Sequence, residues 1–190
     1  MRYFIEFAYK GTNYHGWQIQ PEAISVQEVL TKATNLILKD TFELVGAGRT
    51  DAGVHASQMY AHFDTEVDFN FEDAVRKVNS YLPEDIAVSR IFPVADDAHT
   101  RFDATARTYE YHIHLKKNVF SKDLSWYHFR KLNIDKMNEA AKILLEYEDF
   151  ECFSKTHTDV FTFNCTITEA HWQLNNDNLV FTISANRFLR

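Results

Sequence analysis

A cation, a carboxylate and an imidazole lie within seven residues of one another, at Arg49, Asp51 and His55. The segment that holds them, residues 46–55, contains three of the five glycines of the chain. Loops held between strands are places where polar side chains can be aimed at a ligand. A tight turn explains the same residues, because glycine permits a positive φ and an aspartate can close an Asx-turn on its own backbone. Residue chemistry alone leaves both interpretations open.

Other kinds of catalytic site have weaker support. The glycine spacing fits neither GxGxxG nor a phosphate loop ending in Gly-Lys-Ser/Thr, so we expect no nucleotide cofactor. No HExxH, CxxC or GxSxG motif is present, which argues against a metal site and against a serine or cysteine hydrolase. The residues that could otherwise ligate a metal are His55, His62, Asp64, His112 and His114. We therefore expect neither a nucleotide cofactor nor a metal site.

One segment of the chain is basic although the whole is acidic. Residues 99–131 carry seven Lys or Arg and three Asp or Glu, a net charge of +4, whereas the formal net charge of the chain is −7. Aromatic residues alternate with these cations, and the combination is typical of RNA-binding surfaces, where bases stack and phosphates are neutralised. A solvated run of charge explains the count equally well. The residues concerned are Arg101, Arg107, Tyr109, Tyr111, Lys116, Lys117, Trp126, Tyr127, Phe129, Arg130 and Lys131.

Length and composition indicate an ordinary folded protein. A chain of 190 residues, at roughly 150 per domain, allows one large domain or two small ones. Its 45% hydrophobic and 25% charged residues exclude collagen-like and disordered classes. Two cysteines are too few for a disulfide scaffold. No apolar run reaches the roughly 18 residues of a membrane span, and residues 1–6 do not resemble a signal peptide. These features predict a cytoplasmic protein.

The elements that must position the chemistry follow a β-α-β-β-α-β order in the first half. Alternation predicts strands over residues 2–9, 42–45, 57–63 and 86–94. A capping box at Ser25 begins the first predicted helix, and Asn70 begins a second that Pro83 ends. This order matches a split βαβ, ferredoxin-like unit. The glycine-rich segment then joins two strands of the unit.

The second half predicts a similar but incomplete unit. Strands are expected over residues 107–115, 161–172 and 179–184, with a helix that begins at Asn133 or Asp135. Residues 185–190 are expected to start a further helix that the sequence does not complete. The fold class predicted is α+β, with two ferredoxin-like halves whose antiparallel sheets meet at a central basic cleft. The domains are predicted as residues 1–98, with the Asp51 segment, and residues 99–190, incomplete at the C-terminus.

Four motifs resemble one known family. GRTDAGVHA at residues 48–56 resembles the signature of the TruA family of tRNA pseudouridine synthases, which convert uridine to pseudouridine in the anticodon stem-loop. YxGTxYxGWQxQ at residues 9–20 is similar to the family's opening motif, with Lys10 where an acid is usual. HxRFDAxxRxYxY at residues 99–111 resembles its second motif, and ANxFL at residues 185–189 the start of its last. The resemblance spans essentially all of the chain.

The resemblance implies roles for particular residues. Asp51 is the expected catalytic aspartate, acting either as a nucleophile or as a base that removes the 2′ proton. Arg49 is expected to hold the nucleotide flipped out of the RNA, and Tyr109 to stack on uracil. An Arg or Lys that pairs with the aspartate in the family follows the Phe188-Leu189 motif, and neither Arg187 nor Arg190 matches it. The residues expected to bind the substrate are Gln18, His55, Arg101, Phe102, Arg107, Lys116 and Lys117.

The resemblance further implies a homodimer that binds tRNA across both subunits and modifies uridines 38 to 40, with no cofactor, metal or membrane. Two other functions fit the residues less well. A non-catalytic RNA-binding module of RRM-like architecture would not need Asp51, whose carboxylate repels phosphate. A small glycosidase that pairs Asp51 with Asp103 would leave the basic segment unexplained.

Overall fold

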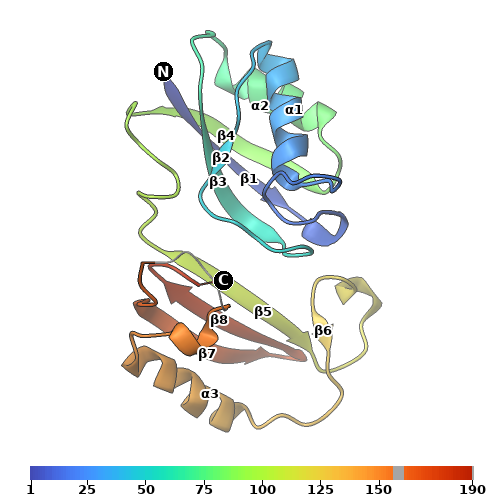
Figure 1. Cartoon of the computed structure of the whole chain (residues 1–190). Helices are drawn as coiled ribbons and strands as arrows, with labels where there is room; N and C mark the ends of the chain where they lie inside the picture. The colour runs from blue at the N-terminus through green and yellow to red at the C-terminus, as the bar shows by residue number, and fades with distance from the viewer. Residues whose placement is uncertain (156–160, 190) are drawn as a thin grey trace. The chain divides into compact units, whose positions relative to one another are not determined.

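The computed structural model describes residues 1–155 and 161–189 and shows a mixed α+β protein. The described residues form two four-stranded sheets and three α-helices. The chain divides into two compact units, Met1–Ala104 and Thr105–Arg190, each with one of the sheets (Figure 1). No described helix is long and apolar enough to cross a membrane.

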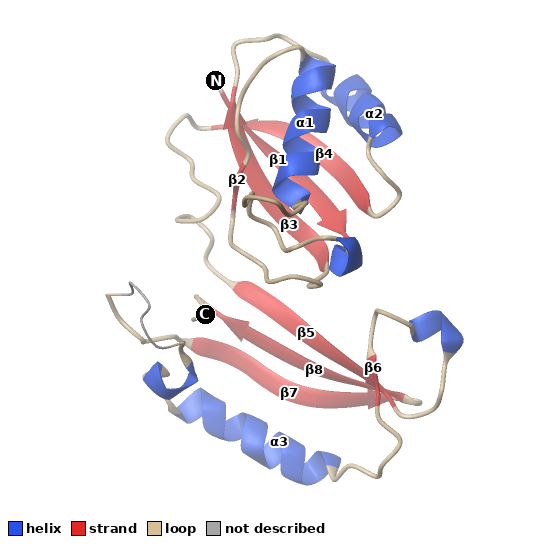
Figure 2. Cartoon of the chain, turned by 45° about the vertical axis from the view of Figure 1, so that its right-hand side comes forward, coloured by secondary structure: helices blue, strands red, loops and turns tan. Residues whose placement is uncertain are grey.

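The first unit is a four-stranded antiparallel sheet with two helices on one face (Figure 2). The strand order is β2-β3-β1-β4, so the N-terminal strand occupies a central position. Side chains of β1 alternate between buried and partly exposed, which places Tyr3, Ile5 and Phe7 in the core beneath the helices. The elements are β1 (Arg2–Tyr9), the 3-10 turn η1 (Gly11–Asn13), α1 (Val26–Leu38), β2 (Val45–Gly46), β3 (Ala56–Asp64), α2 (Phe71–Tyr81) and β4 (Ile86–Val94).

The predicted helix starts of this unit are confirmed. The Ser25 side chain accepts a hydrogen bond from the Glu28 amide, and the Asn70 side chain accepts one from the Asp73 amide. Each cap satisfies an amide that the first turn leaves without a helical partner. The helix α2 stops before Pro83, because the residue before a proline is disfavoured in the α region.

One strand of the first unit is shorter than the sequence predicts. The prediction of a strand over residues 42–45 is wrong, since only Val45–Gly46 pair with β3. Phe42 instead exchanges hydrogen bonds with the side chain of Asn35, at 3.0 and 3.4 Å, and stacks on Phe63 at 4.4 Å between ring centroids. Its apolar side chain is packed as in a strand, but its backbone bonds go to a side chain of α1.

The second unit has the strand order β6-β5-β8-β7. The strands β5, β8 and β7 are antiparallel neighbours, and β6 runs parallel to β5. The helix α3 begins at the predicted cap Asn133 and lies along β7. The elements are β5 (Arg107–His114), η2 (Val119–Ser121), β6 (Trp126–Tyr127), α3 (Ile134–Ile143), η3 (Leu144–Glu146), η4 (Glu151–Phe153), β7 (Ile167–Asn175) and β8 (Asn178–Ala185).

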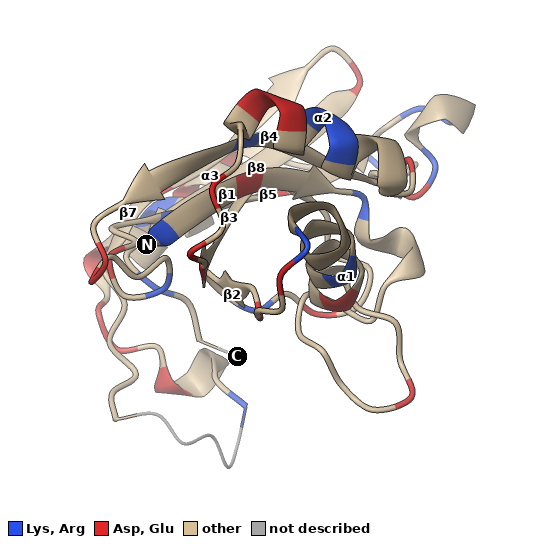
Figure 3. Ribbon diagram, turned by 90° about the horizontal axis from the view of Figure 1, so that it is seen from above, with Lys and Arg blue, Asp and Glu red and all other residues tan. Residues whose placement is uncertain are grey.

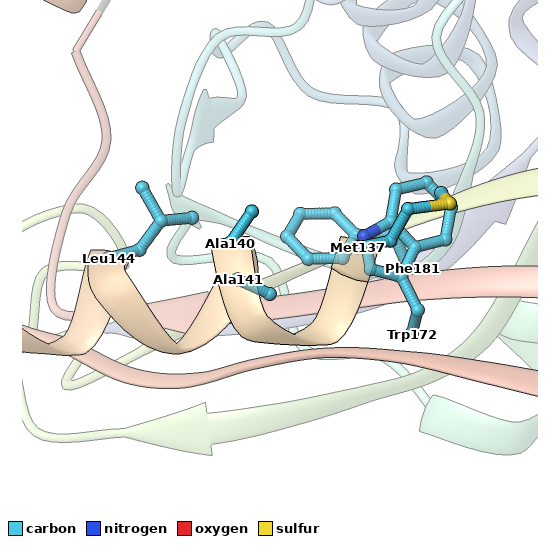
Figure 4. A pocket seen from close by; sticks show the side chains of 6 residues that line it. All are labelled: Met137, Ala140, Ala141, Leu144, Trp172 and Phe181. Atoms are coloured by element: carbon cyan, nitrogen blue, oxygen red, sulfur yellow. The ribbon is translucent and has the colours of Figure 1, made fainter. Parts of the chain in front are cut away.

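An apolar pocket of about 320 Å³ lies between α3 and the sheet (Figure 4). Met137 of α3 lies next to the stacked rings of Trp172 and Phe181, whose centroids are 4.8 Å apart. The other lining residues, Ala140, Ala141 and Leu144, follow on the same side of the helix. The pocket lining therefore contains no charged side chain.

Two predictions for the second unit need correction, and one strand was not predicted. The strand predicted over residues 161–172 begins only at Ile167, because the Cys165 amide bonds the Glu148 carbonyl at 2.8 Å instead of joining the ladder. Residues 186–189 are not helical, since the Asn186 amide bonds the Thr166 carbonyl beside the end of β8. The short strand β6 was not predicted, because two residues are too few to show a period.

Candidate active site

Asp51 lies on a loop whose backbone is held by a second loop. The loop of residues 47–55, here the Asp51 loop, joins β2 to β3, and the loop of residues 10–25 joins β1 to α1. The Trp17 amide donates to the Thr50 carbonyl at 3.3 Å, and the Gly53 amide donates to the Tyr14 carbonyl at 3.2 Å. Both sides of Asp51 are thereby tied to the 10–25 loop.

Two glycines permit this close approach of the loops. A Cβ at Gly11 would lie 1.9 Å from the Val54 carbonyl oxygen, and one at Gly16 would lie 2.1 Å from the Thr50 carbonyl oxygen. Gly16 also has φ +86°, which side-chain-bearing residues rarely adopt. Both glycines of the 10–25 loop therefore belong to its contact with the Asp51 loop.

The Asx-turn interpretation of Asp51 is wrong, although a turn is present. The Val54 amide bonds the Asp51 backbone carbonyl at 3.2 Å, and Gly53 has φ +80°. An Asx-turn would direct the Gly53 amide to the Asp51 carboxylate, but that amide bonds Tyr14. Within residues 1–155 and 161–189 the Asp51 carboxylate has no hydrogen bond or ion pair, and it is exposed. It is thus a carboxylate on a fixed backbone with both oxygens available to a ligand.

Arg49 and His55 flank this carboxylate in different ways. Arg49 is exposed and makes no ion pair with the residues that the structure describes. His55 is partly buried, and its Nδ1 accepts a hydrogen bond from the Gly11 amide at 2.9 Å. That bond assigns the ring proton of neutral His55 to Nε2. His55 therefore takes part in holding the two loops together.

The predicted substrate residues Arg101 and Phe102 project from a turn that is docked on the first sheet. The turn, residues 99–103, is closed by the His99 amide, which donates to the Asp103 carboxylate at 2.6 Å. Phe102 is 73% exposed, and the Arg101 guanidinium lies 5.7 Å from the centre of its ring. A cation and an aromatic face are therefore presented together, as a nucleotide would require.

Thr100 anchors this turn to the sheet. Its hydroxyl donates to the Val45 carbonyl of β2 at 2.8 Å and lies 2.9 Å from Nδ1 of His62 on β3. His62 is 4% exposed, and its burial lowers the pKa of the imidazole to about 4, with Arg2 and His99 adding to the effect. From the sequence, His62 was expected only as a possible metal ligand. No sequence pattern marks Thr100, because a docking contact leaves no local motif.

Most of the remaining predicted site residues lie on the second unit. Tyr109 on β5 is 41% exposed, and its ring meets that of Phe188 edge-on at 4.9 Å. Arg107 donates to the Asn186 carbonyl at 2.9 Å. Lys116 pairs with Asp177 at 3.1 Å, whereas Lys117 is exposed. Gln18, in the first unit, is exposed on the 10–25 loop, and Arg190 lies outside the described residues.

The basic and aromatic segment of the second unit is unusually exposed. Residues 116–131, here called the basic arm, include η2 and β6. Phe120 and Phe129 on this arm are 88% and 73% exposed. The helix α2 is a contrast, since its acidic first turn pairs with the Arg76 and Lys77 that follow (Figure 3). Charges on α2 are therefore balanced locally, while most cations of the basic arm are not paired in the described part of the chain.

No group of three or more His, Cys, Asp or Glu among the described residues is arranged to hold a metal ion. The two cysteines are unpaired, Cys165 being buried and Cys152 exposed. The arrangement offers one exposed carboxylate, exposed cations and exposed rings. Such groups suit a reaction at an anionic, aromatic substrate.

Comparisons with known proteins point in the same direction. Residues 6–103 match a family model described as tRNA pseudouridine synthase. A protein of Bacteroides thetaiotaomicron named tRNA pseudouridine synthase A is 52% identical over 192 residues, which cover 100% of this chain and 71% of that protein. Proteins with the same name from Bacteroides fragilis and Colwellia psychrerythraea are 52% and 41% identical, with 76% and 74% of their lengths covered.

Proposed function

The chain belongs to the tRNA pseudouridine synthase family, and we propose that the Asp51 loop is its catalytic loop. The protein is an isomerase that converts uridine in tRNA to pseudouridine. The family match includes the Asp51 loop, the 10–25 loop and the 99–103 turn. The observation that carries the proposal is the exposed Asp51 carboxylate on a backbone that is tied down on both sides.

The reaction moves one bond of the nucleotide. The bond between C1′ of the ribose and N1 of uracil breaks, uracil rotates, and a bond forms between C1′ and C5. C5 then loses its proton and N1 gains one, so that the product is an isomer of uridine. A carboxylate can add to the electron-poor centre, or it can remove the 2′ proton of the ribose. Asp51 supplies the carboxylate in both routes. Its fixed backbone limits where the carboxylate can move while the base rotates.

Arg49 and Tyr109 are proposed to hold the reacting nucleotide. The Arg49 guanidinium is planar and carries five donors, so it can neutralise a phosphate and stack where the flipped base was. Tyr109 offers a partly exposed ring to the uracil face, and its hydroxyl can assist loss of the C5 proton.

We assign the remaining predicted residues to binding of the RNA. Arg101 and Phe102 present a cation beside a ring, and the basic arm adds exposed rings and cations, which favours single strands and loops over duplex. His55 is assigned to binding because it lies at the end of the Asp51 loop, where its Nδ1 accepts a hydrogen bond from the Gly11 amide. The other residues assigned to binding are Gln18, Arg107, Lys116 and Lys117.

The proposal extends to the assembly and its target. Each unit is one ferredoxin-like half, and the Asp51 loop and the 99–103 turn both belong to the first. The enzyme acts as a cytoplasmic homodimer on uridines 38 to 40 of the anticodon stem-loop.

The test is pseudouridine formation on unmodified tRNA by the wild type and by Asp51→Asn. We expect the variant to lose turnover while tRNA affinity stays unchanged or rises, because a carboxylate near phosphates does not assist binding. Asp68→Asn, at an exposed aspartate of the same unit, is the matched control and should keep full activity. Turnover by Asp51→Asn would remove the catalytic assignment of this residue.

A further inference from the structure

We propose that Asp85 is a positioning residue for the catalytic loop, and that it acts through Tyr14. This inference rests on the proposed function of the Asp51 loop. Asp85 belongs to the turn between α2 and β4, and no motif in the sequence marks it. Its contacts all lead to the 10–25 loop, more than 70 residues earlier in the chain.

Asp85 makes three hydrogen bonds to one short stretch of that loop. The Tyr14 hydroxyl donates to Oδ1 of Asp85 at 2.5 Å, and the Asn13 side-chain amide donates to Oδ2 at 3.0 Å. The Lys10 amide donates to the Asp85 backbone carbonyl at 2.8 Å. Both carboxylate oxygens are therefore occupied by the 3-10 turn η1 and its C-terminal neighbour.

The same stretch holds the C-terminal side of the Asp51 loop. The Tyr14 carbonyl accepts from the amide of Gly53, two residues after Asp51, at 3.2 Å. The Gly11 amide donates to His55 at the end of the loop, at 2.9 Å. A continuous path of hydrogen bonds thus runs from Asp85 through Tyr14 to the residues that follow Asp51.

Tyr14 can transmit position because its side chain is confined. It is 6% exposed, so its hydroxyl has no ready substitute for Asp85 as an acceptor. Burial and the adjacent carboxylate raise the pKa of Tyr14 above its ordinary value, which keeps the phenol protonated and donating. Without Asp85 the Tyr14 hydroxyl would have to move toward water, and the Tyr14 carbonyl that holds Gly53 would move with it.

Asp85 is not placed to react, because both of its oxygens accept bonds from the protein. A shift of about 1 Å at a catalytic group can lower a rate by about 100-fold. We therefore expect loss of Asp85 to slow the chemical step and to leave tRNA affinity almost unchanged. A residue that served only the fold would instead change the fraction of folded protein.

The experiment measures single-turnover rate and tRNA affinity for Tyr14→Phe, Asp85→Ala, the double variant and Asp85→Asn. We expect each of the first two to lower the rate by about 10- to 100-fold, with less than about a 3-fold change in affinity. The double variant should be no slower than the slower single variant, because both changes break the same path of hydrogen bonds from Asp85 through Tyr14. Asp85→Asn keeps an acceptor for Tyr14 and should recover most of the rate. Glu84→Gln, in the same turn and exposed, is the matched control.

Thermal unfolding of each variant shows that the protein is folded at the assay temperature. Wild-type rates in Asp85→Ala and Tyr14→Phe, or strictly multiplicative losses in the double variant, would overturn the proposal. If Asp85→Ala does not fold, Tyr14→Phe decides alone, because it removes only the hydroxyl. Asp51→Asn is assayed in parallel: its turnover would refute the catalytic loop itself, whereas an inactive Asp51→Asn beside a fully active Asp85→Ala would refute only the role of Asp85.

Discussion

Asp51 combines an exposed side chain with a backbone that other residues hold. Backbone bonds reach Thr50 and Gly53 on either side of it, and the Tyr9 hydroxyl lies 2.8 Å from the Thr50 hydroxyl. Preorganised groups of this kind reduce the ordering that must accompany each reaction. Asp51, the proposed catalytic residue, is thereby fixed through its main chain, while its carboxylate stays exposed.

Arg49 should matter more for turnover than for affinity. We expect Arg49→Ala to lower the single-turnover rate by about 100-fold with a smaller loss of tRNA affinity, because the flipped nucleotide would lose a stacked, planar donor. Arg49→Lys should not restore the rate, since an ammonium keeps the charge without the plane. Rapid-quench pseudouridine assays and filter binding measure the two quantities. A large loss of affinity with an unchanged rate would make Arg49 an ordinary phosphate contact.

At the scale of elements, the contact of the 99–103 turn with His62 makes the stability of the protein depend on pH. The unfolded chain binds a proton at this residue below about pH 6.5, and the folded chain only below about pH 4. The contribution of neutral His62 to the free energy of unfolding is therefore fully present above pH 6.5. It is lost progressively as the pH falls toward 4. Below that value no further loss comes from this residue.

We expect the wild type to lose about 1–3 kcal/mol more unfolding free energy than His62→Gln when the pH falls from 7 to 4.5. Urea denaturation at the two pH values measures this difference. Carboxyls whose pKa is lowered by ion pairs, such as Asp64 beside Arg2, are present in both chains and cancel in the comparison. Equal losses in the two proteins would show that His62 titrates normally.

The contact between the two loops predicts unequal costs for two glycine substitutions. Gly53→Ala meets nothing within 4 Å and strains only the backbone, which costs about 1–2 kcal/mol. Gly16→Ala has the same strain and also meets the Thr50 carbonyl oxygen at 2.1 Å, so we expect a loss of about 2–5 kcal/mol. Chemical denaturation of both variants gives the comparison, and equal losses would mean that the loops can separate.

Some elements were predictable because their signals are local. The caps at Ser25, Asn70 and Asn133 lie within three residues of the amides that they satisfy, and the alternating run Ile86–Val94 is a strand over its full predicted length. Phe42 was not predictable, since the Asn35 side chain competes with the sheet for its backbone. The same holds for the candidate site. Its residue types mark the Asp51 loop, but no local pattern shows that the carbonyls of Thr50 and Val54 lie against glycines of another loop.

At the scale of the whole molecule, a net negative protein must bind a polyanion through a limited surface. The formal net charge is −7, so affinity for tRNA should depend on a few unpaired cations rather than on the overall field. Lys116 and Lys117 are adjacent on the basic arm and differ in one respect. Lys116 already pairs with Asp177, whereas Lys117 makes no ion pair within the described part of the chain.

We expect Lys117→Ala to reduce tRNA affinity more than Lys116→Ala does. Loss of one full phosphate contact should lower the slope of log affinity against log salt by about 0.7 to 0.9. The smaller change expected for Lys116→Ala follows from the charge that Asp177 already neutralises. Binding titrations at several salt concentrations test this. Identical slopes for the two variants would mean that neither lysine contacts the RNA more strongly than the other.

The central position of β1 has a consequence for synthesis on the ribosome. This strand is translated first, but its two neighbours, β3 and β4, end only at Asp64 and Val94. At about 5–20 residues per second, β1 waits roughly 5–20 seconds for both neighbours to be made. During that time Tyr3, Ile5 and Phe7 lack the sheet and helices that later bury them. The residues that are most deeply enclosed in the finished unit are thus among those exposed longest in the nascent chain.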